Sequence, residues 1–239
     1  MTDIEGMMTT VETILKMTPE ERKEESRHNI MVASWELFLE KGYNETTTRD
    51  IIRKAGILNG SLYNRFKSKE EILLAIFGEA LEDCLKESSK FLKENEDPLE
   101  VLCMPMAVEL YLASKSKKLA GLLYSAHQSW KAVDMYVEVF NKWAHEILDP
   151  GMVKVDDEGD RLRLITTIGG IGNICGMYAN GFTASYRSVF EYMLRFIGPI
   201  MDMRVYELTK IVDSLCNILE SSKVMICGNT LDEILEYDE

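Results

Sequence analysis

The sequence has little of what strands, disulfide frameworks and metal sites require. Only five prolines and fifteen glycines occur in 239 residues, and alternating runs of β-branched residues bounded by turn dipeptides are almost absent. The five cysteines are odd in number and widely spaced, without a Cys-x-x-Cys pair. This pattern argues against a disulfide framework or a zinc site and favours reduced thiols. The chain is therefore predicted to be all-α, and no cofactor is expected.

Positive charge is also scarce, because 27 lysines and arginines face 40 acidic residues and the formal net charge is −13. Such a total normally argues against a nucleic-acid partner. The charge is uneven, however. The window from Arg22 to Glu70 holds ten bases and seven acids, so it carries +3 and leaves −16 for the rest of the chain. One end of the protein can therefore meet phosphates, and the other should repel them.

The sequence offers no clear membrane signal. Residues 1–17 lack a basic region before an apolar core, so they do not resemble a secretion signal. The 23 residues from Leu164 to Tyr186 carry no charge, but they include three threonines, two asparagines and five glycines. A membrane span needs about 20 predominantly apolar residues. We expect a buried, small-residue helix there, and a cytoplasmic protein. Gly169–Gly176 also lacks the strand and spacing of a nucleotide-binding loop.

Capping residues mark the first helices. Thr18 and Glu21 form a capping box at the start of a helix that should end at Gly42. Ser68 can cap a long helix that reaches roughly Asn95. Further helices are expected through the rest of the chain, up to about residue 219.

Two short helices between these caps match a helix-turn-helix. The run Thr46–Thr48 can cap the first, and the second extends from about Asn59 to Phe66. Gly56 lies in the turn, where glycine adopts a left-handed conformation at little cost. A small core of Ile51, Ala55, Ile57 and Leu62 should hold the two helices at their crossing angle.

The outward face of the second short helix has the chemistry that reads DNA. Asparagine amides can pair with adenine, Arg65 can reach guanine or a phosphate, and hydroxyl groups suit phosphate oxygens. Helix N-termini near Thr48 and Lys69 favour anions. The residues expected to contact DNA are Thr47, Thr48, Arg49, Asn59, Gly60, Ser61, Tyr63, Asn64, Arg65, Lys67 and Lys69.

One spacing runs through this region: Phe38-x-x-x-Gly42, Thr48, Ile51, Ala55-Gly56, Gly60-x-Leu62-Tyr63-x-x-Phe66 and Lys69-Glu70. On this spacing the segment from Ile30 to Leu73 resembles the DNA-binding domain of the TetR (tetracycline repressor-like) family. The resemblance implies a non-enzymatic transcriptional regulator, a repressor that ligand releases from DNA. It also implies a homodimer whose first three helices bind a palindromic operator.

Two positions depart from the family pattern. Leu58 stands where a serine or threonine usually caps the reading helix. Either Asn59 serves as the cap, or the helix starts less firmly and Leu58 makes an apolar contact, for example to a thymine methyl group. Ile52 replaces a small alanine, which can shift the packing of the first three helices.

By the same resemblance, the later helices should supply a ligand pocket and a dimer interface. The pocket would suit a small apolar or flat cationic ligand, although a methionine and aromatic stripe is often plain core. The predicted pocket residues are Cys103, Met104, Met106, Tyr111, Tyr124, His127 and Trp130. The predicted dimer residues, from the helices near 160–179 and 185–200, are Ile168, Gly172, Gly176, Phe190, Leu194 and Ile197.

The domain prediction has four segments. Residues 1–18 are an N-terminal extension, 19–67 the DNA-binding domain, 68–222 the ligand-binding and dimerisation domain, and 223–239 a loosely attached acidic tail. Two other functions stay open: a DNA-binding dimer without a small ligand, and a helical-bundle enzyme with a structural hairpin. The enzyme is disfavoured because no Ser/His/Asp or Cys/His set has supporting context.

Overall fold

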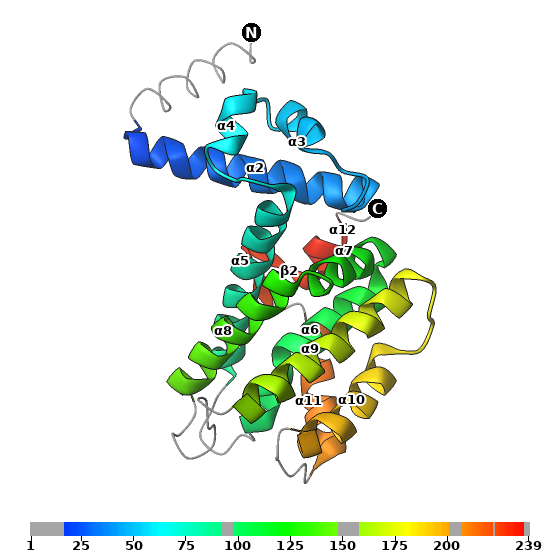
Figure 1. Ribbon diagram of the computed structural model, residues 1–239. Coiled ribbons are helices and arrows are strands. Elements are labelled where there is room, and N and C mark those ends of the chain that lie inside the picture. Colours follow the sequence, from blue (N-terminus) through cyan, green and yellow to red (C-terminus); the bar gives the residue numbers. More distant parts are fainter. Residues whose placement is uncertain (1–16, 92–97, 148–157, 201–206, 222, 237–239) are drawn as a thin grey trace.

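A small helical unit lies across one end of a larger helical bundle in the computed structural model (Figure 1). The structure describes residues 17–91, 98–147, 158–200, 207–221 and 223–236. The predicted N-terminal extension falls outside these residues except for its last two. None of the described helices is long and apolar enough to cross a membrane.

The N-terminal unit consists of α2 (Pro19–Lys41), α3 (Thr48–Lys54) and α4 (Asn59–Tyr63). The side chain of Thr18 accepts a hydrogen bond from the backbone of Glu21, and the Glu21 carboxylate accepts one from the backbone of Thr18. The turn between α3 and α4 contains Gly56 with a φ of +65°. The capping box and the helix-turn-helix arrangement predicted from the sequence are therefore confirmed.

A compact core holds these three helices together. Ile51 of α3 and Leu62 of α4 are fully buried, whereas Ala55 and Ile57 are only half-buried. Phe66 closes this core from the C-terminal side of α4. The short helices depend on this packing, because isolated helices of this length are unstable in water.

The long helix α5 (Lys69–Lys90) connects the N-terminal unit with the bundle. It begins where the Ser68 hydroxyl accepts a hydrogen bond from the Glu71 backbone. At its start, the Glu70 carboxylate accepts hydrogen bonds from Ser129 Oγ at 2.9 Å and Lys131 Nζ at 2.7 Å. These contacts join the N-terminus of α5 to the α7–α8 connection.

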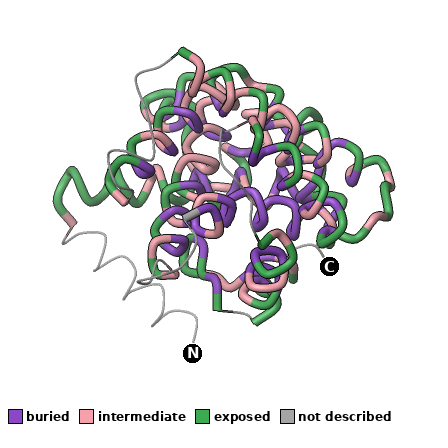
Figure 2. The backbone as a smooth tube through the Cα atoms, turned by 90° about the horizontal axis from the view of Figure 1, so that it is seen from below, coloured by how far each residue is buried: buried purple, intermediate pink, exposed green. Residues whose placement is uncertain are grey.

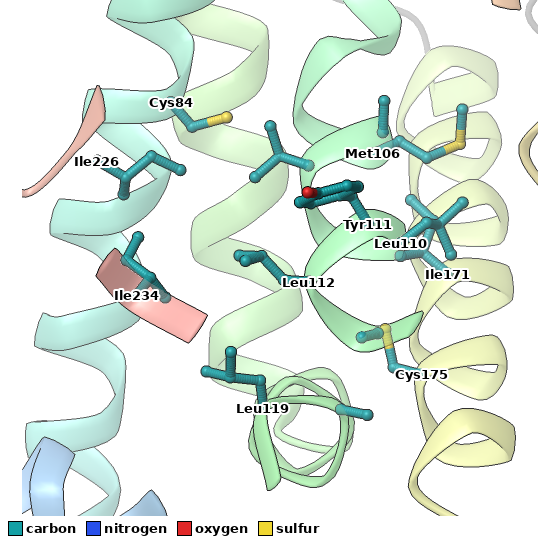
Figure 3. Packing of buried hydrophobic residues seen from close by; sticks show 14 of the residues in the cluster. Cys84, Met106, Leu110, Tyr111, Leu112, Leu119, Ile171, Cys175, Ile226 and Ile234 are labelled. Carbon is teal, nitrogen blue, oxygen red and sulfur yellow. The ribbon is translucent and has the colours of Figure 1, made fainter. Parts of the chain in front are cut away.

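The bundle continues with α6 (Pro98–Lys115), α7 (Lys117–His127), α8 (Trp130–Ile147), α9 (Glu158–Ala179), α10 (Tyr186–Ile200) and α11 (Leu208–Glu220). These helices bury their inner faces in an apolar core, some of which Figure 3 shows, and Figure 2 shows exposed positions along their outer faces. The all-α fold class is confirmed, apart from one small hairpin.

That hairpin lies in the segment predicted to be a loose acidic tail. Strands β1 (Met225–Ile226) and β2 (Asn229–Thr230) pair antiparallel and lead into α12 (Leu231–Glu236). Four apolar side chains hold the segment in the bundle core: Val224, Ile226, Leu231 and Ile234. The expectation of loose attachment was wrong, because these apolar residues lie between the acidic ones and are buried against α5 and α6.

Candidate nucleic-acid interface

The face of α4 that points away from the core carries the predicted reading residues. Asn59, Gly60 and Asn64 are exposed, and 54% of Tyr63 is accessible. Leu62 takes the opposite face and is fully buried, which fixes the rotation of this short helix. Two further predicted contact residues are half-buried: Ser61 within α4 and Arg65 just after it. The structure thus brings amides and hydroxyl groups together on one convex surface.

The start of α3 lies beside this face. The Thr48 hydroxyl oxygen is 3.4 Å from the Tyr63 phenolic oxygen, so two predicted phosphate contacts meet across the turn. The Thr47 hydroxyl is engaged by its own cap, because it accepts from the Asp50 backbone and donates to the Asp50 carboxylate. The hydrogen bonds from Thr47, with a further contribution from Lys41, lower the pKa of Asp50 to about 2.

Two cations flank the reading face. Arg49 and Lys67 are both exposed. Neither side chain makes an ion pair or hydrogen bond with any part of the chain that the structure describes. Free, exposed cations are suited to phosphate oxygens. Lys54 of α3, by contrast, pairs with Glu36 at 3.0 Å.

Lys69 has a different place from the one predicted. Its ammonium group donates to the carbonyl oxygens of Tyr43 at 2.6 Å, Thr46 at 2.8 Å and Asn44 at 3.3 Å. Partial burial lowers its pKa, and its three N–H groups are used by the loop between α2 and α3. The prediction that Lys69 contacts phosphate is therefore wrong for this arrangement. Those carbonyl groups carry no sequence signal, so only the fold could locate them.

Leu58 occupies the N-cap position of α4 without a side-chain hydrogen bond, and 80% of it is exposed. Asn59 is the first residue inside the helix, so it does not serve as the cap. Of the two alternatives raised by the sequence, the structure supports the uncapped helix start with an outward-pointing leucine.

The predicted pocket residues separate into three groups. Cys103 and Met106 line an apolar cavity between α6, α8, α9 and α10, together with Tyr136 and Phe140; we call it the bundle cavity. Met104 and Tyr111 are buried core residues. The last group is His127, Tyr124 and Trp130, from α7 and the start of α8.

Trp130 is 66% exposed and Tyr124 is partly exposed, so the prediction that they line a pocket was wrong. His127 is buried, and its Nε2 lies 2.6 Å from Glu109 Oε2. Glu109 was not among the predicted pocket residues. It is the one charged residue in the apolar run from Cys103 to Ala113, which was a usable signal.

The six predicted dimer residues are all buried within the chain, namely Ile168, Gly172, Gly176, Phe190, Leu194 and Ile197. The glycines do permit close helix approach, as expected, but between α9 and α7 of the same chain. A methyl group on Gly172 would overlap His127, and one on Gly176 would lie 2.8 Å from the Tyr124 ring. The choice of these residues was wrong, because buried side chains cannot meet a second subunit.

The outer faces of α9 and α10 carry a different stripe. Leu162, Met177, Tyr192 and Phe196 are large apolar residues with exposed side chains. Their spacing places them on the outer face of their respective helices. We call these four residues the outer stripe. Large apolar side chains exposed on the outer faces of two helices of one bundle are candidates for an interaction surface.

Comparisons with known proteins agree with this geometry. The family described as "Bacterial regulatory proteins, tetR family" matches residues 30–76. The transcriptional regulator HbdR of Aromatoleum sp. is 29% identical over 109 residues, which cover 46% of this chain and 48% of HbdR. The repressor KstR2 of Mycolicibacterium smegmatis is 36% identical over 76 residues, 32% of this chain and 37% of KstR2. The alignments thus span about half or less of these relatives.

Solved structures extend the likeness to most of the chain. RolR in complex with resorcinol has a TM-score of 0.58 at 19% identity and covers 81% of this chain and 95% of its own. Thermus thermophilus FadR in complex with lauroyl-CoA has a TM-score of 0.53 at 20% identity, with 76% and 97% covered. At such identities the likeness establishes the fold alone. Residues 30–76 are thus a DNA-binding domain of the family described as bacterial regulatory proteins of the tetR type.

Proposed function

We propose that this protein is a homodimeric transcriptional repressor of the cytoplasm that a small ligand releases from a palindromic operator. The observation that carries the proposal is the exposed face of α4, with Asn59, Tyr63 and Asn64, which lies between the exposed cations Arg49 and Lys67. A convex helix of this chemistry fits the major groove, and the cations suit the flanking phosphates. The curated relatives over this region are transcriptional regulators.

A dimer follows from the length of DNA that one unit can read. Helix α4 has five residues and reaches only a few base pairs, so a second subunit is needed for a specific site. The outer stripe of α9 and α10 offers the surface, because a two-fold axis there would pair the same faces of both subunits. Each subunit would then place its α4 in one half of a palindrome.

A ligand role is supported by the bundle cavity and by what related folds bind. The bundle cavity is lined almost entirely by apolar side chains. In the neighbours, RolR binds resorcinol and FadR binds lauroyl-CoA. A small apolar or flat cationic molecule would bias α5, which joins the bundle to the DNA-binding unit. Coupling of this kind is typically about 1–3 kcal/mol.

The test is fluorescence anisotropy with a labelled duplex from the region upstream of the protein's own gene, titrated at several salt concentrations. Specific binding should weaken steeply with salt as counterions compete for phosphates. Lys67→Ala should weaken binding to all sequences and reduce the salt slope by about 1. Asn64→Ala should cost about 1–3 kcal/mol on the operator and little on random DNA.

Gln128→Ala, at an exposed position just after α7 and away from both α4 and the outer stripe, serves as the matched control and should leave both affinities unchanged. Absence of a sequence-specific complex with any segment of that region would overturn the proposal. Specific binding that no small molecule alters would instead favour a DNA-binding dimer without a ligand.

A further inference from the structure

A second cavity lies where the DNA-binding unit meets the bundle. Its wall takes Trp35 from α2, Phe77 and Ala80 from α5, residues of α6 and α7, and Ile226 and Ile234 from the C-terminal segment. We call it the junction cavity. The empty space between these side chains, counted together with the open solvent at its mouth, is about 730 Å³. It shares none of its lining residues with the bundle cavity.

The C-terminal segment forms one side of this cavity. Figure 3 shows the side chains of Ile226 and Ile234 pointing toward Leu112 of α6. The hairpin is fixed to α5 by the backbone N–H of Cys227, which donates to the Asp83 carboxylate at 2.9 Å. The C-terminal segment thus forms one wall of the cavity. The cavity also borders α2 of the N-terminal unit and α5, the helix that connects this unit with the bundle.

The wall also defines what can enter. Nearly all of its surface is hydrocarbon, and Glu109, which is 8% exposed, is the one carboxylate among the described residues of the wall. The Glu109 carboxylate already lies beside His127, and no lysine or arginine lines the cavity. A carboxylate ligand would lie beside the Glu109 carboxylate, with no lysine or arginine of the wall to pair with it, which is unfavourable in a low-dielectric site. A hydroxyl group could donate to the Glu109 oxygens.

From this geometry we infer that the junction cavity is a second ligand site, which takes an uncharged, apolar molecule with at most a hydroxyl head group. Its occupant would contact Trp35 on α2 and Phe77 on α5 at the same time. The inference rests on the proposed function in one respect only, namely that ligand binding at this site changes the affinity for DNA. Binding itself is independent of DNA and can be measured without it.

The three tryptophans make the location measurable by fluorine NMR on the full chain labelled with 5-fluorotryptophan. Trp35 lines the junction cavity, and Trp143 packs against Phe140 of the bundle cavity with ring centres 5.3 Å apart. Trp130 is exposed and reports non-specific binding. Single Trp→Phe variants assign the three resonances.

The probes are 1-octanol, octanoate and octylammonium, which share a chain and differ in head-group charge. Octanol should shift the Trp35 resonance saturably, with little change at Trp143 or Trp130. Octanoate should bind at least about tenfold more weakly, as expected from the loss of one hydrogen bond to a charged acceptor. Glu109→Gln should narrow that difference, because it removes the buried charge. Octylammonium should also bind more weakly than octanol, because Glu109 already has His127 as its partner and a buried ammonium group loses its hydration.

Ala80→Leu fills the junction cavity and should abolish the octanol-induced shift, whereas Thr167→Leu fills the bundle cavity and should preserve it. If Ala80→Leu does not fold, Ile234→Phe fills the junction cavity from the wall that the C-terminal segment forms. The inference would be overturned if octanol shifted the Trp143 resonance in place of that of Trp35, or if octanoate or octylammonium bound as tightly as octanol. It would also be overturned if octanol binding were unchanged in both Ala80→Leu and Ile234→Phe. If octanol binds but leaves the affinity for the operator unchanged, the ligand site is supported and its regulatory role is contradicted.

Discussion

The ammonium nitrogen of Lys69 lies 2.6 Å from the carbonyl oxygen of Tyr43 and 4.3 Å from the centre of its ring. The first residue of α5 therefore holds the loop that connects α2 with α3. Any movement of α5 would act directly on the loop that positions the reading unit. This contact gives a physical route between the bundle and the DNA-binding face.

Lys69→Met should destabilise the protein by about 1–3 kcal/mol, because three carbonyl groups lose a charged donor. Urea unfolding followed by circular dichroism measures the change. Lys67→Met is the matched control, since Lys67 is exposed and its side chain is unpaired among the described residues. The control should keep wild-type stability and lose DNA affinity. Equal stability of both variants would contradict the assignment of Lys69 to the loop.

Leu58→Ser should stabilise the protein by about 0.5–2 kcal/mol, because serine can cap the N-terminus of α4 where leucine cannot. The leucine side chain contributes little to the core at 80% exposure. Thermal unfolding provides the measurement, and Leu58→Ala separates loss of leucine from gain of a cap. If operator affinity falls while stability rises, Leu58 makes an apolar contact with DNA.

Gly172→Ala should destabilise the protein by about 1–3 kcal/mol, the usual cost of overpacking, because the new methyl group would meet His127. Gly169→Ala on the same helix is the control. No atom lies within 4 Å of the added carbon there, so the better helix propensity of alanine should stabilise it by about 0.5–1 kcal/mol. Opposite signs in chemical unfolding are expected. Stabilisation by both substitutions would contradict the close contact of α7 and α9.

Phe196→Glu should convert the proposed dimer to a monomer, because a carboxylate would be buried within the outer stripe. Phe196 is 64% exposed in the single chain, so folding should be unaffected. Sedimentation equilibrium gives the mass. Trp130→Glu, at an equally exposed aromatic residue of α8, should leave the dimer intact. A dimer that survives Phe196→Glu would locate the interface elsewhere.

Asp50→Asn should lower the free energy of unfolding at neutral pH, and the difference from the wild-type protein should disappear in acid. The pKa of Asp50 is about 2 in the folded protein, below its usual 3.8, because Thr47 hydrogen bonds favour the carboxylate. The contribution of the carboxylate is therefore fully present above about pH 4 and lost as the pH falls through 2. Urea unfolding from pH 7 to 2 should show the two proteins converging. Glu24→Gln, at an exposed site in α2, should show no such convergence.

Much of the DNA-binding unit could be predicted because its signals are local. The caps at Thr18, Thr47 and Ser68, and the turn at Gly56, follow from residues within three or four positions of one another. The same logic failed for the C-terminal tail. Its acidic residues dominate the composition, whereas the apolar residues that fix it, such as Leu231, find their partners far away in the sequence.

The sequence by itself determined the helices, the helix-turn-helix and the charge contrast between the two ends, since backbone capping and periodicity depend on near neighbours. Only the tertiary structure decided which faces stay free. Lys69 donates hydrogen bonds to a loop more than twenty residues earlier, and Gly172 packs closely against His127 of another helix. The exposure of Phe196 and the closure of the junction cavity by Ile234 likewise depend on contacts between distant segments. Such contacts are set by packing, which a linear pattern does not encode residue by residue.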